Sequence, residues 1–152
     1  MGKDQECDIE IDSRAVIHPL LHHKQFKMKI YISEDDLVCS IQTDFSKRYP
    51  SLKLEFYSQP HEHAKTCVAM EKVSPQTSID QIRMLHAFGW IDISEDRTAA
   101  ELELDFRHNM GLNVQVFVKS GDRWIETAVT DDWSLGKLNC AATEAAQIEL
   151  GT

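Results

Sequence analysis

Residues 41–58 read IQTDFSKRYPSLKLEFYS, and residues 102–120 read LELDFRHNMGLNVQVFVKS. Each segment places an Asp-Phe pair in a helical pattern, follows it with a helix breaker (Pro50 or Gly111), and continues with alternating polar and apolar residues. A breaker between a helical period and a period of two is typical of a helix that leads into a strand. This weak internal repeat predicts two copies of a strand-helix-strand unit in one small domain.

Length and composition are those of an ordinary globular chain. The 152 residues, 42% hydrophobic and 27% charged, favour a single domain. No apolar run approaches the roughly 20 residues of a membrane helix, and the polar start of the chain is unlike a secretory signal. We therefore expect a cytoplasmic protein with no membrane partner. The net charge of −9 opposes binding to a phosphate backbone, so nucleic acid is not an expected partner.

The cysteine pattern argues against two common site types. Cys7, Cys39, Cys67 and Cys140 lie far apart and form no C-x-x-C motif. The spacing of a zinc ribbon or a thioredoxin-like site is therefore missing. We expect these thiols to be reduced.

The first unit has a clear strand-helix-strand pattern. Residues 26–32 alternate as a strand, and Ser33 then offers an N-cap that is followed by three acidic residues. Apolar residues recur at helical spacing until Pro50, which ends the helix. Leu52 to Tyr57 alternate again and predict the second strand.

The second unit begins with two capping boxes, in which Ser78 and Thr98 each precede a Gln or Glu by three residues. Gly111 supplies the left-handed end of the longer helix. Gly121-Asp122 is a two-residue hairpin signal. The helices are expected over 79–86, from Thr98 to Met110 and from Trp133 onward, and the strands over 90–93, 114–118 and 124–129.

The order of elements predicts an α+β fold. Right-handed crossovers favour a ferredoxin-like split β-α-β sandwich with helices on one face and an extra strand from the C-terminal hairpin. With strands numbered along the chain, the expected spatial order is 5-4-1-3-2. The expected division is an N-terminal arm (1–25), the ferredoxin-like domain (26–130) and a helical C-terminal tail (131–152).

Strand register divides the strand residues between a covered face and an open face. The covered face is expected to take Met28, Ile30, Ile32, Leu52, Leu54, Phe56, Ile91, Ile93, Val114, Val116, Val118, Ile125 and Val129. The open face should then carry many aromatic side chains, more than a monomer normally leaves in water. The binding residues predicted on this face are Tyr31, Tyr57, Trp90, Phe117, Lys119 and Trp124.

What lies over this open face is not decided by the sequence, and three alternatives remain. The arm or the C-terminal helix could lie across it, a second copy could pack against it, or another molecule could bind there. An aromatic sheet face also stacks single-stranded bases in RNA-binding modules. Lys29, Lys53 and Lys119 are balanced by acidic neighbours, however, so the face is neutral and nucleic acid is not favoured.

Loop histidines give a weaker metal hypothesis. His61 and His63 alternate on the polar loop 59–77, where an extended backbone would let both chelate one ion. No third ligand is placed by spacing, and solvated polar residues explain the pattern better than a metal site does. We expect no cofactor, and no motif of a nucleophilic or phosphate-binding site occurs in the chain.

The run GLNVQVFVKSG at residues 111–121, followed by Trp124, Glu126-Thr127 and TDDW at residues 130–133, resembles a family of uncharacterised bacterial proteins. Their usual form is similar to GLxVQVFRKSGxxWLETxxTDxWTL, and weaker similarity extends the match to roughly residues 80–140. This chain differs in having Val118 where an Arg is expected and Ser134 in place of Thr. The resemblance implies the hairpin boundaries and carries over no catalytic residues.

Three functions follow from these patterns. The first is a non-enzymatic protein-interaction or oligomerisation module, a homodimer or a binder of another protein, that uses the open sheet face. The second is a small-ligand-sensing regulatory domain, by analogy with other ferredoxin-like folds. The third is a metal-dependent activity through His61 and His63.

Overall fold

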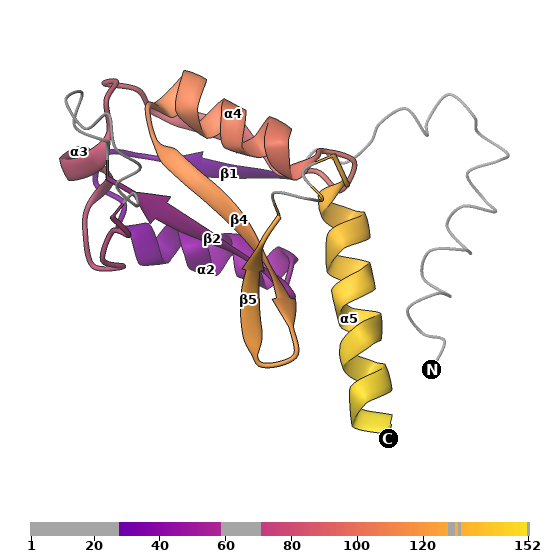
Figure 1. Ribbon diagram of the computed structural model, residues 1–152. Coiled ribbons are helices and arrows are strands. Elements are labelled where there is room, and N and C mark those ends of the chain that lie inside the picture. Colours follow the sequence, from indigo (N-terminus) through magenta and orange to yellow (C-terminus); the bar gives the residue numbers. More distant parts are fainter. Residues whose placement is uncertain (1–27, 59–70, 128–129, 131, 152) are drawn as a thin grey trace, which may run out of the picture.

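The computed structural model describes residues 28–58, 71–127, 130 and 132–151. Within these residues the fold is α+β, with four helices and two small antiparallel sheets (Figure 1). The elements are β1 (Lys29–Ile32), α2 (Val38–Arg48), β2 (Leu52–Tyr57), α3 (Ile79–Ile82), β3 (Gly89–Asp92), α4 (Ala99–Met110), β4 (Asn113–Ser120), β5 (Arg123–Glu126) and α5 (Leu135–Gly151).

The strands form two separate sheets with defined registers. β1 pairs with β3, with Ile30 opposite Ile91. β2 pairs with β4, with Leu54 opposite Val116, and β4 pairs with β5 through the two-residue turn that joins Ser120 to Arg123. The sheet orders are therefore β1-β3 and β2-β4-β5.

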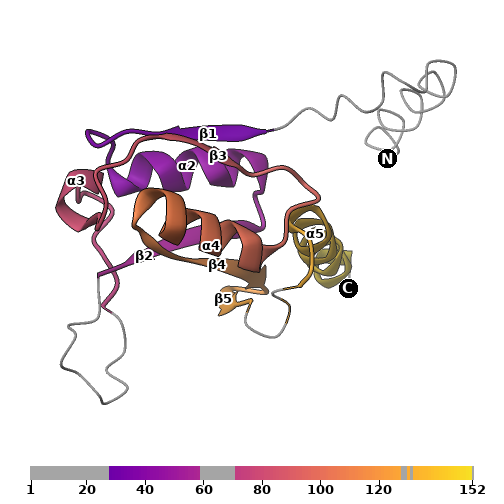
Figure 2. The ribbon, with the colours of Figure 1, turned by 90° about the horizontal axis from the view of Figure 1, so that it is seen from above.

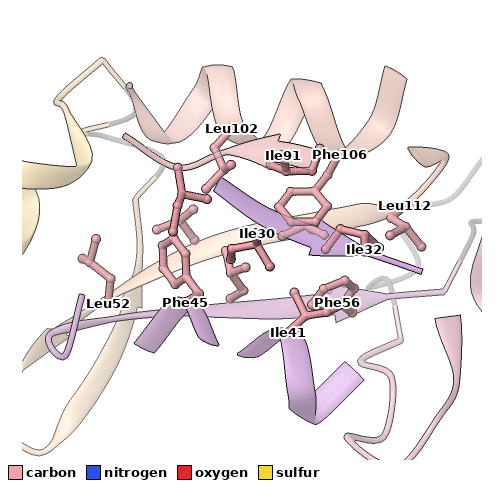
Figure 3. Close-up of a cluster of buried hydrophobic side chains, with 14 of the residues drawn as sticks. Ile30, Ile32, Ile41, Phe45, Leu52, Phe56, Ile91, Leu102, Phe106 and Leu112 are labelled. Carbon is pink, nitrogen blue, oxygen red and sulfur yellow. The ribbon is translucent and has the colours of Figure 1, made fainter. Parts of the chain in front are cut away.

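The two sheets and the two long central helices enclose one core. Seen from above, the β1–β3 pair lies on one side, β2 and β4 lie on the other, and α2 and α4 close the space between them (Figure 2). Side chains from these walls point toward one another (Figure 3). Phe56 of β2 and Phe106 of α4 meet edge to face, with ring centroids 5.9 Å apart. Such a pair adds about 0.5–1.5 kcal/mol to the hydrophobic burial of its rings.

This arrangement corrects the ferredoxin-like prediction. The expected order 5-4-1-3-2 is right in placing β1 beside β3 and β4 beside β5, but wrong in placing β4 beside β1 and β3 beside β2, because β2 pairs with β4 and the β1–β3 pair forms a separate sheet. The helices consequently close two sides of a core between two sheets and do not cover one face of a single sheet (Figure 2). The crossover rule assumes that both strands of a strand-helix-strand unit join one sheet. Here each unit contributes its first strand to one sheet and its second strand to the other.

The internal repeat extends further than the Asp-Phe segments. Residues 30–45 (IYISEDDLVCSIQTDF) align without a gap with residues 91–106 (IDISEDRTAAELELDF). Ile30 faces Ile91, its equivalent in this alignment, and Leu54 faces Val116, its equivalent when one extra residue is allowed before β4. That pairing is what a two-fold axis through both sheets would produce. The units therefore exchange strands around an approximate internal two-fold axis.

The helices that follow the two units dock in the same way. The Ile79 N–H at the start of α3 donates to the Asp36 carbonyl (2.8 Å), and the Leu135 N–H at the start of α5 donates to the Arg97 carbonyl (2.7 Å). Gly136 follows in α5, where a Cβ would lie 3.1 Å from the Glu95 Cβ. The glycine, which lowers helix propensity, thus allows α5 to pack closely against the segment around Glu95.

Helix ends agree with the capping predictions at three of four points. The Thr98 hydroxyl accepts from the Glu101 N–H (3.1 Å), the Gln81 side chain accepts from the Ser78 N–H (3.1 Å), and Gly111 ends α4 with a φ of 65°. Ser33 is not the N-cap of α2, which begins at Val38. The first N–H groups of α2 donate instead to backbone carbonyls of the segment 75–77, a long-range contact that no local pattern could predict.

The predicted inside-outside register is confirmed for most strand residues. Buried members of the expected set are Ile30, Ile32, Leu52, Leu54, Phe56, Ile91, Ile93, Val114 and Val116. The prediction that Ile125 is buried is wrong, because its side chain is 49% exposed on the hairpin. A helix forms as expected in the C-terminal region, from Leu135 to Gly151. The N-terminal arm (1–25), His61, His63 and Val129 lie outside the described residues.

Candidate functional site

The six predicted binding residues do not share one face. Tyr31 and Trp90 lie on the outward side of the β1–β3 pair, and they are register partners. Tyr57, Phe117, Lys119 and Trp124 belong to the β2–β4–β5 sheet. Because the two sheets lie on opposite sides of the core (Figure 2), their outward sides point away from each other. The single aromatic face predicted from one continuous sheet is therefore two faces.

The smaller face is apolar and exposed. Tyr31 and Trp90 form an edge-on pair, with ring centroids 5.1 Å apart and an interplanar angle of 70°. Trp90 is 60% exposed, and Phe88, two residues earlier in the chain, is 68% exposed. A groove of about 490 Å³ beside β1 is lined by Tyr31, Trp90 and, from α2, Asp44 and Arg48 among others.

The larger face carries lysines over aromatic rings. We call Lys53, Lys72, Phe117, Lys119 and Trp124 the lysine–aromatic face. The Lys53 Nζ lies 4.9 Å from the centroid of Trp124 and 5.7 Å from that of Phe117. The Lys72 Nζ lies 5.7 Å from the Phe117 centroid, and the Lys119 Nζ lies 5.9 Å from the Trp124 centroid. Each such cation–π contact contributes about 0.5–1 kcal/mol at an exposed site, so the face is held in a defined shape.

A nearly buried carboxylate anchors these lysines. Glu55 is 8% exposed, and its Oε2 lies 2.9 Å from the Lys53 Nζ and 3.4 Å from the Lys72 Nζ. The Gln42 side-chain amide from α2 donates to Glu55 Oε1 (3.2 Å). With two ammonium groups and one amide around it, Glu55 acts as a fixed negative charge that orients the lysines.

A groove of about 540 Å³ borders the lysine–aromatic face. Gln42 and Ser46 of α2 form part of its wall, and both donate to carbonyls on the free edge of β2: Gln42 to Leu54 (2.9 Å) and Ser46 to Leu52 (3.4 Å). Trp124 of β5, whose ring lies near the Lys53 Nζ, also lines the groove. The full lining is Cys39, Gln42, Thr43, Ser46, Lys47, Lys53, Leu54, Glu55, Pro75 and Trp124.

The internal symmetry supplies a built-in comparison for this groove. The equivalent groove between α4 and β4 measures about 170 Å³. There Glu103, the counterpart of Gln42, accepts from the N–H of Val116, the counterpart of Leu54 (2.9 Å). Trp124 of β5 has no aromatic counterpart among the described residues that line the smaller groove. The larger groove therefore has an aromatic wall residue that the described lining of the smaller groove lacks.

Titration behaviour offers no sign of an activated nucleophile among the groups with shifted values. Burial, followed by the charges of Glu55 and Glu126, raises the pKa of the Tyr57 phenol. Burial and the neighbouring Glu144 raise the pKa of the Cys140 thiol, which keeps that thiol protonated. Within the part of the chain that the structure describes, no cluster of three or more His, Cys, Asp or Glu side chains could hold a metal ion.

Sequence reasoning missed several members of this site. Lys53 and Glu55 alternate along one strand and had been expected on its outward side, yet their ion pair depends on rotamers that a pattern does not give. Gln42 reaches Glu55 from α2, and Lys72 from the segment that pairs with the end of β2. Only the fold brings these two to the site.

Comparisons with protein-family models, with curated proteins and with solved structures find no match. Among the helices of the described residues, none combines the length and the apolar character needed to cross a bilayer. The geometry of the site therefore carries the functional argument.

Proposed function

We propose that the protein is a non-enzymatic protein-interaction module that docks a partner on the lysine–aromatic face and its groove. The first partner to consider is a second copy of the chain, as a homodimer. The proposal includes a cytoplasmic location, no membrane or nucleic-acid partner, and membership of the uncharacterised bacterial family that residues 111–133 resemble.

One observation carries this proposal: the β4–β5 hairpin adds to an outward face more than to the core. Arg123, Ile125 and Glu126 of β5 are exposed, whereas Trp124 turns toward Lys53 and the groove. A hairpin that buries so little of itself contributes little hydrophobic stabilisation. Aromatic side chains held in place beside charged groups are the usual anchors of protein interfaces, because little side-chain entropy is lost on binding.

The exposed Tyr31–Trp90 face provides the matched control. Sedimentation or light scattering after gel filtration would compare the wild-type chain with Trp124→Glu and Trp90→Glu. We expect the wild type and Trp90→Glu to show twice the chain mass of 17.4 kDa, and Trp124→Glu to show the single mass. Thermal unfolding of each variant checks that it is folded. If Trp124→Glu is a dimer and Trp90→Glu is a monomer, the interface lies on the β1–β3 sheet and the proposed face is wrong. A monomeric wild type would refute self-association.

The groove also supports a second candidate, a small-ligand-sensing domain. Its volume of about 540 Å³ falls in the range of roughly 300–1,000 Å³ that small-molecule sites occupy. A thermal-shift screen of amino acids and nucleotides would reveal such a ligand, because binding to the folded state raises the melting temperature. A shift that Trp124→Glu abolishes would favour this candidate, and a flat response to the whole panel would count against it.

A further inference from the structure

We propose that the groove beside the lysine–aromatic face receives the N-terminal residues 4–12 of a second copy of this chain. This inference rests on the proposed function and names the segment through which the homodimer forms. Its basis is the match between the charge and periodicity of residues 4–12 and the charge and shape of the groove.

The lysine–aromatic face has a local surplus of positive charge. Lys53 and Lys72 share the carboxylate of Glu55, and Lys119 adds a third ammonium group over Trp124. Among the residues of β2, β4 and β5, Glu126, which lies opposite Phe117 in the register, is the other carboxylate on this side of the sheet. Three lysines thus stand against two glutamates in a chain whose net charge is −9. An anionic partner is favoured here more than over the rest of the surface.

The beginning of the chain has the complementary pattern. From residue 4 to residue 12 every second residue is acidic, in the order Asp4, Glu6, Asp8, Glu10 and Asp12. In an extended chain these carboxylates share one side and lie about 6.6 Å apart. The intervening Gln5, Cys7, Ile9 and Ile11 share the other side. We call this segment the acidic row.

The groove offers a wall for each side of such a segment. Lys53, Glu55 and Trp124 lie on the sheet side of the lining, and Cys39, Gln42, Thr43, Ser46 and Lys47 lie on the α2 side, with Leu54 and Pro75 also present. An extended segment set between these walls would direct its carboxylates to Lys53 and the neighbouring lysines of the face, and its isoleucines toward Cys39 and Thr43. The smaller equivalent groove presents Glu103 and has no counterpart of Trp124 in its lining, so it would repel an acidic row.

Length and charge make a second copy the fitting donor. The sixteen residues from Asp12 to Met28 can span up to roughly 50 Å, whereas the radius of gyration of a domain this size is about 15 Å. The row can therefore reach across a neighbouring molecule. Two chains of charge −9 repel each other unless opposite charges meet, and reciprocal insertion of two acidic rows closes a symmetric dimer with two such contacts.

The test uses two full-length variants that are defective in different ways. One neutralises the row (Asp4→Asn, Glu6→Gln, Asp8→Asn, Glu10→Gln and Asp12→Asn), and the other carries Trp124→Glu with the row intact. Each alone should raise the dimer dissociation constant by at least about tenfold, because several charge contacts of modest strength are lost. Mixed in equal amounts, they should form a heterodimer, since an intact row then meets an intact groove.

A matched control keeps the charge but breaks the alternation. Exchanging Asp8 with Ile9 and Glu10 with Ile11 leaves composition unchanged, and we expect this variant to dimerise more weakly than the wild type. Equal dimerisation would show that net charge alone matters and would overturn the inference. Raising the salt from about 0.05 to 0.5 M should weaken the wild-type dimer.

The outcomes separate this inference from the proposed function. If the row-neutralised chain dimerises like the wild type while Trp124→Glu does not, the face docks something other than the row and only the inference fails. If Trp124→Glu dimerises normally, the proposed function fails. If the mixture yields no heterodimer, the row does not act between copies. A zero-length carbodiimide cross-link between residues 4–12 and Lys53 of the same chain would also refute insertion into a second copy.

Discussion

The hydroxyl of Tyr49 joins the two structural units, and its removal has a predictable cost. Tyr49 follows α2 and is 1% exposed, and its hydroxyl donates to the carbonyl of Ile93 at the end of β3 (2.6 Å). In Tyr49→Phe the ring keeps its packing, including the contact with Phe45 at 5.3 Å between centroids. The buried Ile93 carbonyl, however, loses its donor.

The magnitude follows from that unsatisfied carbonyl. Leaving a buried acceptor without a partner costs about 2 kcal/mol, which for a chain of this length lowers the melting temperature by about 4–8 °C. Urea unfolding followed by circular dichroism would measure both the midpoint and its slope. The slope should stay constant because the buried area is unchanged. The control is Tyr57→Phe on the outward side of β2, which should cost less than about 0.5 kcal/mol.

The same residue predicts a pH effect. Burial raises the pKa of the Tyr49 phenol well above its ordinary value. Below pH about 10 the phenol is protonated in both states, and above it the unfolded chain ionises first. The unfolded state then binds fewer protons than the folded state, so the free energy of unfolding falls as the pH rises. Tyr49→Phe should show a shallower alkaline decline. A variant as stable as the wild type, with the same decline, would refute the role of this hydroxyl.

Three further substitutions test local features. Thr98→Ala removes the side-chain cap of α4 and should cost about 1 kcal/mol in urea titrations. The backbone N–H of residue 98, which is the main cause of the lowered Glu101 pKa, is kept in this variant. Both proteins should therefore lose stability as the pH falls through the Glu101 pKa, and a variant as stable as the wild type at neutral pH would contradict the cap. Gly111→Ala should cost more than about 2 kcal/mol, since a Cβ would lie 2.5 Å from the Leu85 nitrogen at a φ of +65°; a melting temperature near that of the wild type would contradict the left-handed turn. Arg83→Met should change the free energy of unfolding by less than about 1 kcal/mol. The Arg83 side chain is 5% exposed, and its Nε and Nη1 have no acceptor among the described residues, so burying this charge is already costly. A loss of stability above about 2 kcal/mol would show that the ion pairs of Arg83 outweigh that cost.

Local chemistry was predictable from the sequence, and long-range pairing was not. Alternation placed Ile30, Leu54 and Val116 correctly inside, because the period of two is a property of each strand alone. Gly111 and Thr98 marked helix ends for equally local reasons. The partner of a strand, by contrast, depends on which sheet receives it, and apolar alternation is the same in either case.

The candidate site shows the same division. The two-residue turn at Gly121-Asp122 was predicted from the sequence, and this turn places Lys119 opposite Trp124. Trp90 was expected near them only because one sheet was assumed, and the second sheet carries it to the opposite side. Gln42 reaches Glu55 from a different element, through packing that no sequence pattern encodes.

The exchange of strands between the two halves has a consequence for the ancestry of the chain. Two separate polypeptides, each containing one strand-helix-strand unit, would build the same enclosed core by association, with Ile30 and Leu54 at the crossing points. Gene duplication and fusion would then free either copy to diverge. A tandem fusion of residues 28–88 should accordingly fold with a symmetric interior, in which Ile30 of each copy faces its own equivalent.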